Sequence, residues 1–128
     1  MAKKAKLDQH WKNEPEEHDF PAAADYLGLL FSETAASVIV DRLRAAPTTS
    51  RKAKDLLRAS RLELLPKADP EVARDLKKVA RGERLSPVLL VRAGGADPLI
   101  VADGYHRICA SYHLDEDAPI PCRLVDSR

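Results

Sequence analysis

Apolar and polar positions divide the chain into a polar start, a helical first half and an alternating second half. Residues 1–19 are polar and aperiodic, which predicts a flexible lead-in, with Trp11 as a candidate anchor to the body. From residue 20 onward the apolar residues recur at helical spacing. We therefore expect residues 20–60 to form a helical N-terminal part.

Three short helices are predicted in this part of the chain. The first begins near Pro21, because proline suits the first turn of a helix. The second follows Ser32, whose hydroxyl is a favourable N-cap. The third begins near Arg51, with Thr48 or Thr49 as its cap. Together they would form an all-helical extension that precedes the sheet-containing part of the chain.

The large apolar side chains of this half are expected to form its core. They are Tyr26, Leu29, Leu30, Val38, Val40 and Leu43. If many of them stay exposed, they would mark a surface for a partner, including a homodimer formed through the helical N-terminal part.

The second half alternates short apolar runs with helical periods. In chain order we expect an edge strand in "LELLP", a helix that Asp69 caps before Pro70, strands in "SPVLLVRA" and "LIVA", a helix from Tyr105, and a closing strand in "IPCRLV". The predicted fold class is α+β, with a helical N-terminal extension on a small mixed-sheet core over residues 61–128. One compact domain would include both parts.

Composition narrows the classes of function. The 21 Lys and Arg nearly balance the 20 Asp and Glu, so net charge does not indicate DNA binding, although a local patch could still contact it. No apolar run approaches the length of a membrane span, so no membrane partner is expected. Cys109 and Cys122 lack metal-site spacing and are read as buried thiols, which suits a cytoplasmic protein.

The stretch "VADGYHRICASYHL" is where we expect function. It predicts a strand that runs directly into a helix at Gly104. Glycine allows a sharp turn and close approach of a ligand, and the first turn of the helix offers unpaired N–H groups. His106 and Arg107 lie in that turn. Amides, an imidazole and a guanidinium together predict a site for an anion such as phosphate.

Other interpretations of these residues stay open. Asp103 could cap the helix, bind magnesium, or act as a base toward a hydroxyl. Arg107 could instead pair with an acid, and His106 could be a plain surface residue.

The segment "LSPVLLVRAGGADPLIVADGYHRICASYHLDEDAPIPCRLV" resembles the core of the ParB/sulfiredoxin-like superfamily. Pro87 stands near the start of the first strand, and Gly104, His106 and Arg107 match the turn that opens the family's helix. The closing "IPC" strand also falls at the expected place. The resemblance covers about residues 61–125.

The branches of that superfamily differ at Tyr105. Sulfiredoxins have a nucleophilic cysteine there, so their chemistry is not expected here. ParB proteins, which bind CTP, have a glutamate in their turn. Free-serine kinases carry D-G-x-H-R, which residues 103–107 reproduce. The resemblance to these kinases implies that His106 and Arg107 hold nucleotide phosphates.

It also implies an upstream acid that accepts the proton of a substrate hydroxyl. Asp69 and Glu71 are the candidates, with Asp69 the better positional match. Each has an ordinary alternative, as a helix cap and as a first-turn acid respectively.

The leading functional hypothesis is a nucleotide- or phosphate-binding ParB-like domain. Its site would consist of Gly104, Tyr105, His106 and Arg107, with ADP, ATP or CTP as ligand. A small-molecule phosphotransferase or a nucleotide hydrolase would follow if Asp103 binds Mg²⁺ or acts as a base. The alternatives are a non-catalytic DNA- or protein-binding module, of plasmid, phage or toxin–antitoxin type, and a ParB-like nuclease.

Overall fold

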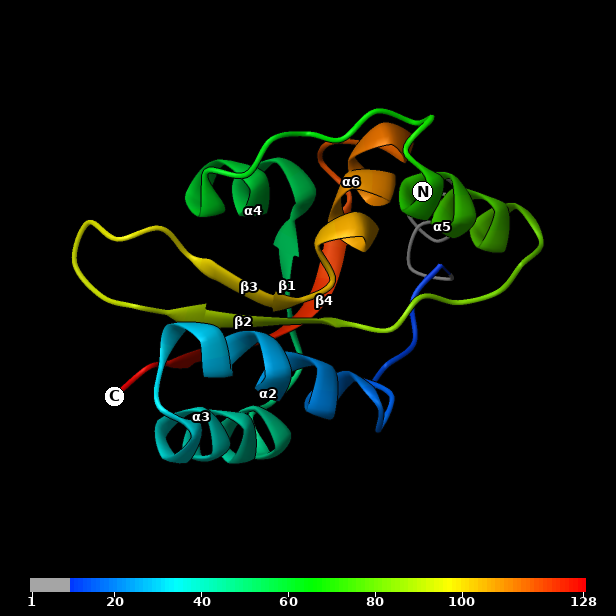
Figure 1. Cartoon of the computed structure of the whole chain (residues 1–128). Helices are drawn as coiled ribbons and strands as arrows, with labels where there is room; N and C mark the ends of the chain where they lie inside the picture. Colours follow the sequence, from blue (N-terminus) through cyan, green and yellow to red (C-terminus); the bar gives the residue numbers. More distant parts are fainter. Residues whose placement is uncertain (1–9) are drawn as a thin grey trace.

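The computed structural model describes residues 10–128 and has an α+β fold (Figure 1). In that part of the chain, five helices accompany one four-stranded sheet. In order, the elements are α2 (Asp19–Leu30), α3 (Glu33–Ala45), β1 (Thr49–Lys52), α4 (Ala53–Ser60), α5 (Pro70–Ala80), β2 (Val88–Arg92), β3 (Ile100–Asp103), α6 (Tyr105–Leu114) and β4 (Pro119–Asp126).

The sheet is mixed, with strand order β1-β4-β2-β3. The strands β2 and β4 are parallel, whereas β1 pairs antiparallel with β4 and β3 antiparallel with β2. The apolar run in β2 is buried on both faces: Val88 and Leu90 join one core cluster, and Leu89 and Val91 join the other. A central strand covered on both sides requires such a continuous apolar run rather than an alternating one.

Helices cover both faces of the sheet (Figure 1). The pair α2 and α3 packs on one face, and α4, α5 and α6 lie over the other. The chain therefore forms three layers. The end of β3 and the start of α6 meet where the sheet passes into the second helical layer.

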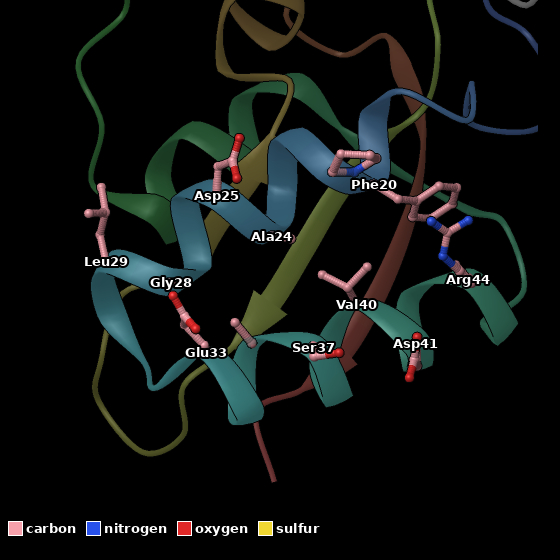
Figure 2. Close-up of a pocket in the computed structure, with 12 residues that line it drawn as sticks. Phe20, Ala24, Asp25, Gly28, Leu29, Glu33, Ser37, Val40, Asp41 and Arg44 are labelled. Carbon is pink, nitrogen blue, oxygen red and sulfur yellow. The ribbon is translucent and has the colours of Figure 1, made fainter.

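The helices α2 and α3 are neighbours joined by a short turn (Figure 2). As predicted, Ser32 caps α3, and its hydroxyl accepts a hydrogen bond from the amide of Ala35 at 3.1 Å. The predicted core of this half is only partly right. Val40 and Leu43 are buried, but four of the predicted core residues are exposed, namely Tyr26, Leu29, Leu30 and Val38.

Two assignments from the sequence, one of a helix start and one of a strand, are wrong. Residues 49–52, expected as the cap and start of the third helix, form the edge strand β1, whose Thr49 lies opposite Cys122 of β4. All four side chains of β1 are exposed, so pairing with β4 creates this strand without any apolar signal of its own. The run "LELLP" forms no strand; instead, the carbonyls of Glu63 and Leu65 contact side chains of α6.

Trp11 anchors the start of the described chain, as the sequence suggested. It is 4% exposed and forms a parallel bridge with Leu85. The amide of Lys12 donates to the carbonyl of Leu85 at 2.8 Å, and the amide of Leu85 donates to the carbonyl of His10 at 2.7 Å. The first nine residues of the predicted lead-in lie outside the described part.

Both cysteines are buried and unpaired, as the sequence predicts. Within residues 10–128, no helix has the length and apolar character needed to cross a membrane.

Candidate functional site

Gly104 makes the turn between β3 and α6 in a conformation that other residues rarely adopt. Its φ is +111°, and a Cβ at this position would lie 2.8 Å from Cβ of Val88 and 3.0 Å from a terminal nitrogen of Arg107. Both the backbone angle and the lack of space therefore require glycine. Because glycine is also the N-cap, no side chain caps α6, and the amides of its first turn have no side-chain acceptor.

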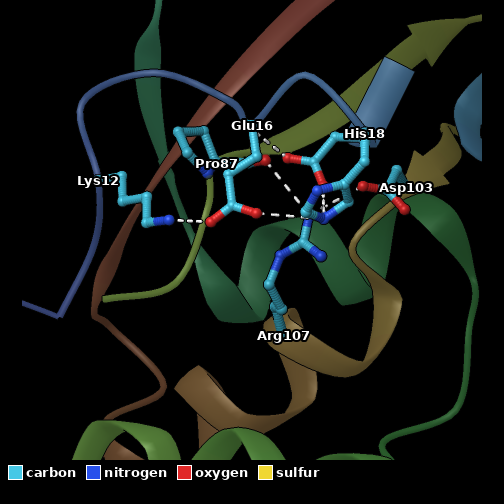
Figure 3. A network of polar contacts seen from close by, with 7 residues as sticks. Lys12, Glu16, His18, Pro87, Asp103 and Arg107 are labelled. Atoms are coloured by element: carbon cyan, nitrogen blue, oxygen red, sulfur yellow. Dashed lines mark hydrogen bonds and ion pairs between the residues drawn. The ribbon is translucent and has the colours of Figure 1, made fainter. Parts of the chain in front are cut away.

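The guanidinium of Arg107 is directed toward the end of β3 and the loop before β2 (Figure 3). Its Nη2 donates to a carboxylate oxygen of Asp103 at 3.1 Å and to the carbonyl of Pro87 at 3.3 Å. Its Nε is buried and has no hydrogen-bond partner among the described residues. Arg107 thus connects the end of β3 to the loop before β2 through hydrogen bonds.

A second carboxyl lies beside this ion pair. Asp19, the first residue of α2, is 2% exposed and accepts a hydrogen bond from the amide of Glu16 at 2.9 Å. Burial raises the pKa of Asp103; Arg107 opposes that shift, and the hydrogen-bonded Asp19 carboxyl adds to it. A neighbouring carboxyl disfavours the ionised form of Asp103, because two negative charges close together repel each other.

The segment before α2 closes this side of the turn (Figure 3). Lys12 forms an ion pair with Glu16, and the Nε2 of His18 lies 3.1 Å from the other Glu16 oxygen and 3.5 Å from Asp19. The end of the predicted lead-in, residues 12–19, therefore lies directly beside the predicted site.

On the other side of the turn, a pocket of about 270 Å³ opens between α5 and α6. The helix α5 contributes Glu71, Arg74, Asp75 and Lys78, and the turn contributes Asp103, Gly104, Tyr105, His106 and Arg107. The first-turn residues of α6 thus face the side chains of α5 across a small, strongly polar space.

Asp75 is the residue of this pocket that the sequence reasoning missed. It is 9% exposed, and no hydrogen bond or ion pair to another described residue involves its side chain. Burial raises its pKa, while the positive charges of Arg107, Lys78 and His106 partly counteract that shift. The helical spacing of the sequence could have identified Asp75. It follows the buried Val72 by three residues and therefore shares the inward face of α5.

The other charges of the pocket are partly paired. Glu71 and Arg74 form an ion pair at 3.0 Å, one turn apart on α5. Within residues 10–128, Lys78 forms no ion pair with a carboxylate. The pocket therefore offers Lys78, His106 and the amides of α6 to an anion, and Asp75 to a hydrogen-bond donor.

The two predicted acids on α5 lie in different surroundings. Glu71 lines the pocket. Asp69 caps α5, where one carboxylate oxygen accepts the amides of Glu71 at 3.0 Å and Val72 at 3.1 Å. Tyr105 turns its hydroxyl away to donate to the carbonyl of Glu63. The structure thus brings Glu71, Asp103 and the turn together and gives Asp69 a capping role.

The surroundings of Asp103 do not fit a magnesium ligand. Its carboxylate already contacts the cationic guanidinium of Arg107 and the carboxyl of Asp19. Hard cations favour sets of free carboxylate and water oxygens. Among residues 10–128, no cluster of three or more acidic, histidine or cysteine side chains is arranged to hold a metal ion.

Comparison with known proteins adds no relative: no family model, curated protein or solved structure matches this chain.

Proposed function

We propose that the pocket between α5 and α6 binds the phosphate end of a nucleotide. The observation that carries the proposal is the juxtaposition in one pocket of an uncapped helix N-terminus with Lys78 and His106. Free amides at a helix start favour phosphate oxygens, and the Lys78 ammonium and a ring N–H of His106 add further donors. The resemblance of residues 103–107 to the D-G-x-H-R turn of free-serine kinases supports the same ligand.

The size of the pocket limits what it encloses. Sites for whole drug-sized ligands measure roughly 300–1,000 Å³. A space of about 270 Å³ suits phosphates and a small neighbouring group, with the nucleoside outside. ADP, ATP and CTP therefore all remain candidate ligands.

Asp75 extends the proposal to phosphotransfer. A buried carboxylate beside a phosphate site is repelled by the phosphate unless it accepts a proton or a hydrogen bond. A substrate hydroxyl supplies that hydrogen bond, and Asp75 then takes the hydroxyl proton as general base while the oxygen attacks the terminal phosphorus of the nucleotide. The bond from that phosphorus to the bridging oxygen breaks, and the nucleotide leaves with one phosphate fewer. Arg107 would act indirectly, by holding Asp103 and the turn in place.

Calorimetry with ADP, ATP and CTP, with and without Mg²⁺, tests the proposal. We expect one of them to bind below millimolar concentration, and the Lys78→Met variant to weaken it about tenfold through loss of a charge-assisted contact. Lys77→Met removes an exposed lysine of the same helix and should change nothing.

Absence of binding for all three nucleotides at millimolar concentration would contradict the proposal and leave the non-catalytic module. If a nucleotide binds, Asp75→Asn separates binding from catalysis. The variant should keep the nucleotide and lose its turnover in the presence of hydroxyl-bearing acceptors.

A further inference from the structure

The outer face of α2 and α3 contains an open groove unrelated to the phosphate pocket (Figure 2). Its volume is about 560 Å³. Small residues from both helices line it, namely Ala24, Gly28, Ala36 and Ser37. Leu29, at its edge, is 82% exposed. An apolar groove with an exposed leucine at its edge is typical of a binding surface rather than of a solvated helix pair.

Three carboxylates line the same groove. Asp25 extends from α2, and Glu33 and Asp41 extend from α3 (Figure 2). None of the three forms an ion pair with another described residue. The only cation among the lining residues, Arg44, is bound to Glu17 at 2.5 Å and lies 4.4 Å over the ring of Phe20. The groove is thus apolar along its floor and negative at its edges.

We propose that this groove binds an amphipathic helix of a partner protein, with an apolar stripe flanked by Lys and Arg. Small floor residues allow close approach of a third helix to α2 and α3. An apolar stripe buried in such a groove is a recurrent mode of helix recognition. The unpaired carboxylates select basic flanks and disfavour acidic ones.

The charge pattern argues against a second copy of this chain as the occupant. A two-fold contact through the groove would bring the same surface of both copies together, and therefore carboxylates against carboxylates. The nearby arginines do not offset this repulsion. Arg44 is engaged by Glu17, and Arg42 donates to the carbonyl of Asp126.

Fluorescence anisotropy with designed peptides tests the proposal on the full chain. The probe is a labelled helix of about 18 residues with leucines at helical spacing and lysines elsewhere. Its counterparts replace every lysine with glutamate or scramble the leucines. We expect the lysine peptide to bind at least about tenfold more tightly than either counterpart, and to weaken as salt rises.

Two pairs of variants locate the binding. A Cβ at Gly28 meets no atom within 4 Å, so Gly28→Arg fills the groove without disturbing the fold. It should weaken the lysine peptide about tenfold, whereas Ala22→Arg, on the exposed side of α2, should not. The double variant Asp25→Lys with Glu33→Lys should have the same effect.

Its matched control, Glu14→Lys with Asp55→Lys, makes the same change in net charge outside the groove. Equal binding of the lysine and glutamate peptides, or equal effects of the groove and control variants, would overturn the proposal. So would a dimer in sedimentation that Gly28→Arg converts to monomer, since a second copy would then be the occupant.

A third outcome concerns the chain's own lysines. If Lys3→Glu, Lys4→Glu and Lys6→Glu together raise the affinity for the lysine peptide but not for its leucine-scrambled counterpart of the same charge, the lead-in competes for the groove and the partner assignment falls. Nucleotide binding should be unaffected by Gly28→Arg, so this inference and the proposed function succeed or fail separately.

Discussion

The guanidinium of Arg107 lies 3.1 Å from the carboxylate of Asp103, four residues earlier, across the turn that joins β3 to α6. Both side chains are largely buried, at 17% and 19% exposed. The pair therefore fixes the geometry of the turn and shapes one wall of the pocket between α5 and α6. Arg107 lines the pocket and also holds the turn through Asp103 and Pro87. Under the proposed function, it therefore serves mainly as a positioning residue, and the phosphate contacts fall to the amides of α6, Lys78 and His106.

Removal of that guanidinium should destabilise the fold. Arg107→Met leaves the Asp103 carboxylate and the Pro87 carbonyl without their donor, and a largely buried unpaired charge costs about 2 to 3 kcal/mol. Urea unfolding measures the loss. Arg74→Met breaks an exposed ion pair and should cost no more than about 0.5 kcal/mol. Similar losses of unfolding free energy for both variants would show that the Arg107–Asp103 pair stabilises the fold no more than an exposed ion pair does.

Gly104→Ala should be more damaging than an alanine at another left-handed glycine. Both Gly104 and Gly82 have positive φ, at +111° and +81°. A Cβ at Gly82 meets open space, so only the backbone penalty of about 1 to 2 kcal/mol applies there. At Gly104 the Cβ also collides with Val88, and overpacking adds roughly 1 to 3 kcal/mol.

Thermal unfolding of the two glycine variants gives the comparison. A Gly104→Ala variant as stable as Gly82→Ala would mean that β2 moves aside easily. The turn would then be less rigid than the close approach of Val88 implies.

Asp75→Asn should stabilise the protein at neutral pH. Since burial raises the pKa of Asp75, the folded state binds the proton more tightly than the unfolded chain does. The stability of the natural chain therefore falls as pH rises from the unfolded pKa, near 4, through the folded pKa. Asparagine removes this dependence and should add about 0.5 kcal/mol at pH 7, with screening by water at the pocket taken into account.

Urea unfolding at pH 4 and pH 7 measures this effect. The variant's advantage should shrink at the lower pH. Asp25→Asn, on the exposed surface of α2, serves as control and should change stability at neither pH. Destabilisation of Asp75→Asn at pH 7 would show that the carboxylate contributes favourable contacts to the fold.

Two substitutions of Asp69 distinguish a role as helix cap from a role as catalytic base. Asp69→Ala should cost about 1 kcal/mol, because the amides of Glu71 and Val72 lose their acceptor. Asp69→Asn keeps an acceptor and should be nearly neutral, with nucleotide turnover unchanged. Loss of turnover at full stability in Asp69→Asn would instead restore the prediction that Asp69 is the base.

The sequence alone determined those elements whose signal is local. Asp69 before Pro70, Ser32 before α3, the apolar run of β2 and the glycine between β3 and α6 each specify an element boundary through the backbone conformation of one or two residues. These signals sufficed for the α+β class and for the position of the turn. They concern neighbours along the chain, so they need no knowledge of packing.

Tertiary structure decided the rest. Thr49 to Lys52 became a strand only because β4 lies beside them, and Arg107 turned inward because Asp103 and Pro87 are within its reach. Asp75 joined the pocket through the packing of α5 against α6. Each of these features depends on a residue distant in sequence, or on which of two possible contacts a side chain makes. The conformational preferences of neighbouring residues along the chain carry no information about either.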